Sequence, residues 1–200
     1  MLFANAIVEN LKYAIISLDA INRGKISWDE FYGDPYLFYF FHMQSVLTAQ
    51  GNIWNVLFRG NGSSQARRNR EKLKQEFGID PKDYPLVGDK RFRNTNEHFD
   101  DRYHRFRGRL GDFNIIENST DPFVRRALLD TPHLRTIDLE KMRYITYDNN
   151  GEQIFLDLIE LRAEMYTMLQ KISTCDRMRS YIENNPRTLL LIEEVNNDQL

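Results

Sequence analysis

Apolar side chains recur at intervals of three and four residues over several stretches of the chain, which is the spacing of helices that bury one face. The first stretch lies before Gly24 and carries this apolar stripe: Phe3, Ile7, Leu11, Ala14, Leu18 and Ile21. A second helix is predicted to open at Asp34-Pro35, because Asp can cap a helix and Pro needs no amide partner in the first turn. Its stripe is long enough for the central helix of a bundle: Tyr36, Phe40, Met43, Leu47, Gly51, Trp54 and Phe58.

Four further helices are predicted. A short, very basic helix is expected over about 65–76, and an irregular segment with two prolines follows it. The next helix is predicted to start near Asp89 and to end by Gly108 or Gly111. A final helix is predicted over about 156–172, and a shorter one opens at Asp121-Pro122.

A β-hairpin is predicted near residues 142–157. The stretches MRYITYD and EQIFLD flank Asn149-Asn150-Gly151, and Asn-Gly is typical of a type I′ turn between two strands. The predicted fold class is therefore mainly α: a helical bundle of about five main helices with one appended hairpin. We expect a single domain over 1–200, with a weaker helical pattern and a polar tail from about residue 175.

Charge is distributed unevenly along the chain. The net charge is −2, but the segment from Arg59 to Arg109 holds 14 Lys/Arg against 8 Asp/Glu, a net of +6. The remaining residues therefore carry −2 − 6 = −8. A local excess of positive charge fits a partner that bears phosphates; the alternative is a solvated face that acidic neighbours balance in the fold.

The number of cysteines and the hydropathy of the chain indicate the cellular compartment in which we expect the protein. Cys175 is the single cysteine, so the chain forms no internal disulfide, which favours a reducing environment. The first residues lack the features of a signal peptide, and the apolar run YLFYFF at 36–41 is too short to span a membrane. We therefore expect a cytoplasmic protein that makes no membrane contact.

Candidate chemistry lies in residues 93–106, RNTNEHFDDRYHRF. On a helix, one narrow arc collects these residues for burial: Phe92, Phe99, Tyr103, Phe106 and Leu110. Arg93 and His98 are five residues apart, which is about 140° around a helix at 100° per residue. The two side chains can therefore converge only on something that lies across the helix, or through pairing with a second copy of the chain.

This constellation resembles the HEPN superfamily of helical-bundle proteins. Catalytic members carry an Arg, then four to six residues, then a His, often with Asn directly after the Arg. The match here is Arg93-Asn94-Thr95-Asn96-Glu97-His98. The resemblance implies a metal-independent endoribonuclease that acts as a homodimer, without a cofactor. It also implies a toxin–antitoxin or phage-defence setting, with an antitoxin protein as a further partner.

The resemblance assigns roles to the motif residues. His98 would move the proton of the ribose 2′-hydroxyl, since an imidazole exists in both protonation states near neutral pH. Arg93 would neutralise charge on the phosphate, and Asn94 would fix the imidazole tautomer or bond the phosphate. Further side chains are expected to guide single-stranded RNA: Arg91, Arg102, Arg105, Tyr103, Arg67 and Arg68.

Two features limit the expected chemistry. No Cys or His spacing suits zinc, and we expect no metal site. Members of the superfamily that are silenced by nucleotidyl transfer carry a Tyr two positions after the His, whereas Asp100 stands there in this chain. We therefore expect no control of that kind.

Alternative interpretations remain for the same residues. His98 can be a surface histidine paired with Asp100 or Asp101, and Arg102 and Arg105 can pair with acidic neighbours on the helix. In that case the chain is a non-catalytic HEPN-like bundle that binds nucleic acid or a protein partner. A third possibility is a helical bundle unrelated to this superfamily.

Overall fold

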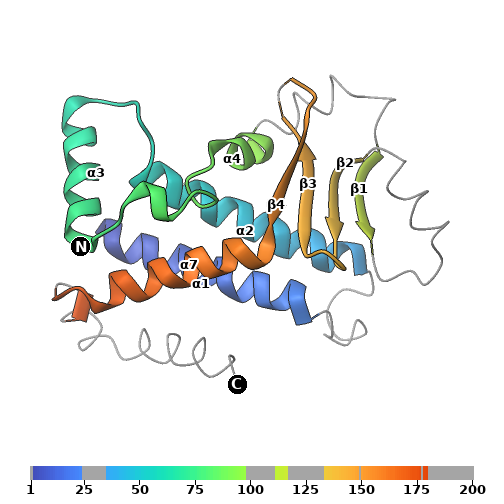
Figure 1. Cartoon of the computed structure of the whole chain (residues 1–200), viewed down its shortest axis with the longest axis horizontal. Helices are drawn as coiled ribbons and strands as arrows, with labels where there is room; N and C mark the ends of the chain where they lie inside the picture. The colour runs from blue at the N-terminus through green and yellow to red at the C-terminus, as the bar shows by residue number, and fades with distance from the viewer. Residues whose placement is uncertain are drawn as a thin grey trace.

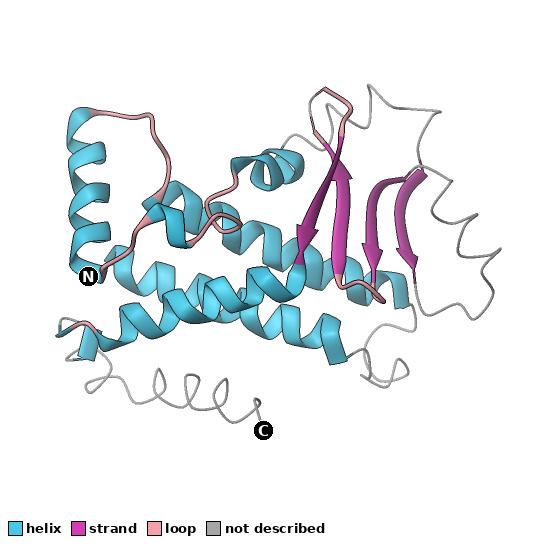
Figure 2. Ribbon diagram, in the orientation of Figure 1, coloured by secondary structure: helices cyan, strands magenta, loops and turns pink. Residues whose placement is uncertain are grey.

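The computed structural model describes residues 2–23, 35–97, 111–116, 133–148, 150–176 and 178–179. Within these residues the fold is mainly helical, with a small sheet beside one end of the helices (Figure 1; Figure 2). The helices are α1 (Leu2–Arg23), α2 (Pro35–Leu57), α3 (Ser64–Phe77), α4 (Lys90–Glu97) and α7 (Leu158–Thr174), with a short 3₁₀ turn at Pro81–Asp83. The sequence-based prediction of a mainly α fold is confirmed.

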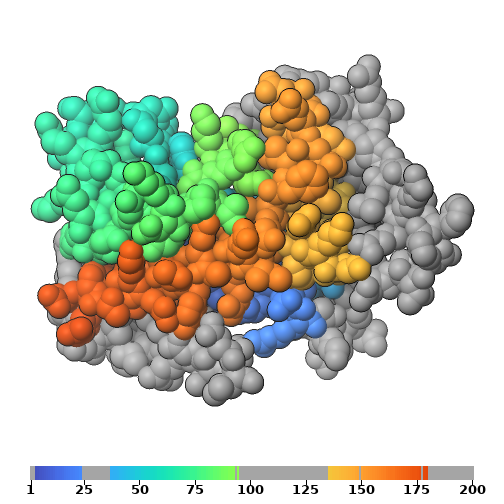
Figure 3. Space-filling view, in the orientation of Figure 1, coloured from blue at the N-terminus to red at the C-terminus, as the bar shows by residue number. Residues whose placement is uncertain are grey.

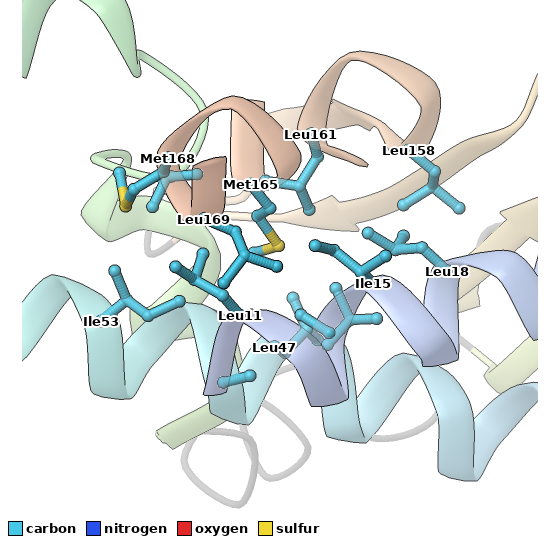
Figure 4. Close-up of a cluster of buried hydrophobic side chains, with 14 of the residues drawn as sticks. Leu11, Ile15, Leu18, Leu47, Ile53, Leu158, Leu161, Met165, Met168 and Leu169 are labelled. Carbon is cyan, nitrogen blue, oxygen red and sulfur yellow. The ribbon is translucent and has the colours of Figure 1, made fainter. Parts of the chain in front are cut away.

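Three long helices form the core. α1 lies between α2 and α7 in contact with both, and their apolar side chains interdigitate (Figure 4). The predicted stripe of α7 is buried along its whole length: Leu158, Leu161, Met165, Leu169 and Ile172. On α1 the predicted stripe is buried from Ile7 onward, whereas Phe3 is 60% exposed because it lies in the first turn, at the edge of the bundle.

α3 stands across one end of the bundle (Figure 1). Its N-terminus is capped by Ser63, whose hydroxyl accepts the backbone N–H of Ala66 at 3.2 Å. Its C-terminus ends at Gly78, which adopts φ +63° and so provides the left-handed residue that commonly stops a helix. Phe77 is the buried residue of α3, so most of this helix surface faces solvent.

The sheet has the strand order β1-β2-β3-β4. The predicted hairpin is confirmed as β3 (Arg143–Tyr147) and β4 (Gln153–Asp157), paired antiparallel. The turn differs from the predicted two-residue type I′ turn. Asp148 N–H donates to the Glu152 carbonyl oxygen at 2.9 Å, and Gly151 adopts φ +83°. Besides two-residue turns, hairpins commonly have a three-residue loop with glycine in the left-handed region, as here. The Asp148 carboxylate stabilises this loop by accepting the N–H groups of Asn150 and Glu152.

Two strands beyond the hairpin were not predicted. β2 (His133–Asp138) pairs antiparallel with β3, and β1 (Gly111–Ile116) pairs parallel with β2. The buried residues of β2 include charged Arg135 and Asp138, which hides the apolar alternation that normally indicates a strand. Ile137, which is fully buried, joins this strand to the helical core.

Some predictions fall outside the described residues. They are the short helix at Asp121-Pro122, the motif helix beyond Glu97, and most of the C-terminal tail from about residue 175. Among the helices that are described, none combines the length and apolar character needed to cross a lipid bilayer.

The core predicts a contrast between two aliphatic residues of α7. Leu161 is fully buried, whereas Ile159 is 59% exposed. Leu161→Ala should lower the free energy of unfolding by about 2–5 kcal/mol, because it leaves a cavity between helices. Ile159→Ala should change it by no more than about 0.5 kcal/mol. Urea denaturation of both variants tests the packing, and equal losses would contradict it.

Candidate functional site

The candidate site is built on α4. The structure describes its helical backbone from Lys90 to Glu97, so the predicted start near Asp89 is confirmed. Asp89 accepts the backbone N–H of Arg91 at 2.9 Å, as a capping carboxylate does. Phe92 is fully buried, which fixes the side of α4 that faces the bundle. Asn94 is partly buried.

Arg91, expected to guide RNA, forms an ion pair with Asp89. Its Nε donates to the two carboxylate oxygens at 3.1 and 3.0 Å, and its Nη2 donates to Oδ2 at 2.7 Å. These hydrogen bonds, and then the attraction of the Asp89 charge, raise the pKa of Arg91. The side chain is 56% exposed, so the guanidinium lies at the surface but with a carboxylate beside it.

A tight loop leads into α4. The Gly88 N–H donates to the Tyr84 carbonyl oxygen at 2.9 Å, and the Asp89 N–H donates to the Leu86 carbonyl oxygen at 3.2 Å. Tyr84 and Val87 are buried. A Cβ at position 88 would lie 3.1 Å from the Tyr84 carbonyl oxygen, so the backbone here leaves little room for any residue but glycine.

Two polar side chains from distant parts of the chain hold this loop. Glu164 of α7 accepts the Leu86 N–H through both carboxylate oxygens, at 3.1 and 3.0 Å, and the Val87 N–H through Oε2 at 2.9 Å. Gln50 of α2 donates from Nε2 to the Leu86 carbonyl oxygen at 2.6 Å. The loop is therefore bonded to α2 and α7 through the same residue, Leu86.

Both side chains are in a low-dielectric environment. Gln50 is fully buried, and within the described part of the chain its Oε1 has no hydrogen-bond partner. Burial raises the pKa of Glu164, the bonds from Val87 and Leu86 lower it, and the nearby charge of Glu160 raises it further; the net direction is upward.

Lys171, near the C-terminus of α7, holds the preceding part of the loop. Its Nζ donates to the Gly78 carbonyl oxygen at 3.0 Å and lies 3.5 Å from Oδ2 of Asp83. The same ammonium is 5.8 Å from the centre of the Tyr84 ring. The whole segment between α3 and α4 is thus tied to α7.

α3 and α4 belong to one face of the molecule, with the loop between them (Figure 3). Arg67 and Arg68, which the sequence assigns to RNA binding, are exposed on α3. Arg68 Nη2 donates to Gln65 Oε1 at 3.1 Å, an uncharged partner that leaves its positive charge available. The structure therefore places these basic residues and Arg91 on two consecutive helices, α3 and α4.

The structure does not describe the other predicted site residues. Outside the described residues lie His98, Arg102, Tyr103 and Arg105, and the side chain of Arg93 is not described either. Sequence reasoning missed Gln50 and Glu164. The available signal was weak: each is a polar residue within the buried stretch of a core helix.

A separate pocket of about 400 Å³ lies between the ends of α1 and α7. Its polar wall includes the ion pair of Asp19 with Arg162, which joins these helices. No predicted site residue lines it. Among the residues that the structure describes, no group of three His, Cys, Asp or Glu side chains is arranged to hold a metal ion.

Comparisons with known protein families, with curated protein sequences and with solved structures find no match to this chain. The site must therefore be interpreted from its own residues.

The raised pKa of Glu164 predicts a pH-dependent stability. The folded protein holds this proton more tightly than the unfolded chain, so the contribution of Glu164 to the free energy of unfolding falls as pH rises through its titration range. Glu164→Gln removes that contribution. The difference in unfolding free energy, wild type minus variant, should therefore decrease from about pH 4 to pH 7 in urea titrations. An increase over the same range would contradict the assignment.

Proposed function

We propose that the chain is a metal-independent endoribonuclease of HEPN type that acts as a homodimer. The observation that carries the proposal is the motif Arg93-Asn94 followed by His98, which begins on a helix of a mainly helical bundle. The burial of Phe92 supports it, because α4 then has one side in the bundle while Arg91 remains at the surface. Asn94 is four residues before His98 in the sequence, which would be about one turn of a helix.

The chemistry follows from the residue types. The ribose 2′-hydroxyl attacks the adjacent phosphorus as His98 accepts the hydroxyl proton. The bond from phosphorus to the 5′-oxygen of the next nucleotide breaks, and that oxygen takes up a proton. The products are a 2′,3′-cyclic phosphate and a free 5′-hydroxyl. Arg93 pairs with the phosphate oxygens, where negative charge accumulates during the attack.

A second copy of the chain supplies the missing geometry. Arg93 and His98 are about 140° apart around a straight helix, so one helix spreads them away from a single phosphate. Two motif helices facing each other bring the Arg of one protomer toward the His of the other. The proposed active unit is therefore a homodimer with RNA between its motif helices.

The basic surface of α3 gives RNA an approach to α4. Arg67 and Arg68 are exposed in the N-terminal half of α3 and carry positive charge. Arg102, Arg105 and Tyr103 are proposed to continue this path beyond α4, with the tyrosine stacking on a base. An antitoxin that covers the same surface would fit the toxin–antitoxin setting that the resemblance implies.

RNA cleavage without metal is the direct test. The purified protein should cleave RNA in EDTA and leave cyclic phosphate ends. His98→Ala should lower the rate by about 10²–10⁴, the usual contribution of general acid–base catalysis. His104→Ala, which removes another imidazole from the same stretch, is the matched control and should retain activity.

Intact RNA with the wild type over a range of substrates would reject the nuclease. If RNA still binds under those conditions, the chain is instead a non-catalytic bundle that binds nucleic acid.

The α3 surface predicts a change in the salt dependence of RNA binding. Replacing Arg67 and Arg68 together by Ala should weaken binding and reduce the slope of log K against log salt by roughly 0.7 for each lost phosphate contact. Lys141→Ala removes an exposed cation from the β2–β3 turn and serves as the control. An unchanged slope in the α3 variant would show that RNA does not contact this helix.

A further inference from the structure

We infer that Glu164 and Gln50 are positioning residues, which set the placement of α4 and hence of the motif that it carries. The role in cleavage rests on the proposed function, whereas the placement of α4 does not. Both residues lie far from α4 in sequence: Glu164 is 78 residues from Leu86, and Gln50 is 36 residues from it. They meet at the segment that immediately precedes the motif helix.

The contacts hold Leu86 from both sides of its peptide backbone. Its N–H donates to the Glu164 carboxylate, and its carbonyl oxygen accepts from Gln50. The next N–H, that of Val87, donates to the same carboxylate. These groups are part-buried, where a backbone N–H or C=O without a partner is costly. If the side chain of Glu164 or Gln50 is removed, the loop must therefore move until water or another group bonds to the backbone groups left without a partner.

Movement of this loop must reach α4, because little slack separates them. Val87 is three residues before Lys90, the first residue of α4. The intervening Gly88 and Asp89 are themselves held by hydrogen bonds to the carbonyl oxygens of Tyr84 and Leu86. Gly88 also has a backbone carbonyl oxygen 3.1 Å from where a Cβ would stand, so the turn is packed against itself.

α4 packs against α2. It is short, eight residues, and Phe92 is its buried apolar anchor. This packing against α2 gives the helix one point of attachment. The polar anchors on the loop supply a second fixed point, and two points determine which way Arg93 and Asn94 face. Glu164 and Gln50 thus act through the loop, without touching the RNA.

Amide hydrogen exchange of the full chain tests the placement directly. Glu164→Ala should raise the exchange rate of the Leu86 and Val87 amides and of α4 by tenfold or more, while α3 stays within about threefold of wild type. Glu164→Gln should remain close to wild type, because a glutamine oxygen can accept the same N–H groups. Glu160→Ala removes an exposed carboxylate from the same helix and is the matched control.

A second comparison distinguishes a general loss of stability from a specific loosening of the loop and α4. Leu161→Ala destabilises the core and leaves both Glu164 and Gln50 in place, so at equal overall stability it should leave the protection of α4 relative to α3 unchanged. Gln50→Ala should loosen the same segment as Glu164→Ala and carries the test if the latter does not fold. Equal loosening of α4 and α3 in both Glu164→Ala and Gln50→Ala would overturn the inference.

The kinetics of RNA cleavage test whether this positioning affects catalysis. Glu164→Ala should lower kcat tenfold or more with KM within about threefold, because misplaced catalytic groups affect the chemical step more than RNA binding. Glu164→Gln should restore kcat. If the wild type does not cleave RNA, the proposed function fails, and hydrogen exchange alone then decides the inference. If the wild type cleaves and Glu164→Ala leaves both kcat and α4 exchange unchanged, the positioning role is rejected while the nuclease stands.

Discussion

The carboxylate of Glu164 accepts the backbone N–H groups of Leu86 and Val87, and the placement of α4 depends on this contact. A half-buried carboxylate is costly to desolvate, and its raised pKa records that cost. The backbone donors offset part of it. Gln50 completes the arrangement from α2, so the backbone of the loop is bonded to two core helices. Strong packing of α1, α2 and α7 makes this possible, because it gives both side chains a rigid base.

The apolar stripe of α7 could be predicted from the sequence because helical periodicity is local, and each predicted residue from Leu158 to Ile172 is buried. The hairpin could also be predicted from the sequence, since Gly151 marks its turn. The third loop residue could not, because the loop is stabilised by backbone N–H groups that donate to the Asp148 carboxylate. Other features depend on distant contacts. Residues 135–138 of β2 are all buried, with charged Arg135 over the Phe40 ring at 4.8 Å, so β2 lacks the alternation of an ordinary strand. Glu164 is a polar residue within the buried stretch of α7, and its partner, the loop at Leu86, is far from it in the sequence.

For the candidate site, the sequence was informative about α4 and silent about what holds it. The start of the motif helix near Asp89 follows from local spacing, and the structure confirms it. Asp89 caps α4 and also pairs with the Arg91 guanidinium, so a carboxylate already balances the positive charge of Arg91. Arg67 and Arg68 on α3 have no such partner in the contacts described. If RNA approaches this face, α3 is the better source of unneutralised positive charge.

NMR titration of the wild-type protein tests the anchor of α4 most directly. The side-chain carboxyl carbon of Glu164 and the backbone amides of Leu86 and Val87 are followed together as pH changes. If the carboxylate accepts both amides, all three signals should shift with one midpoint, which lies above the ordinary glutamate value of about 4.5. Amide signals of Leu86 and Val87 that do not shift with the Glu164 titration would show that the carboxylate does not hold the loop in solution.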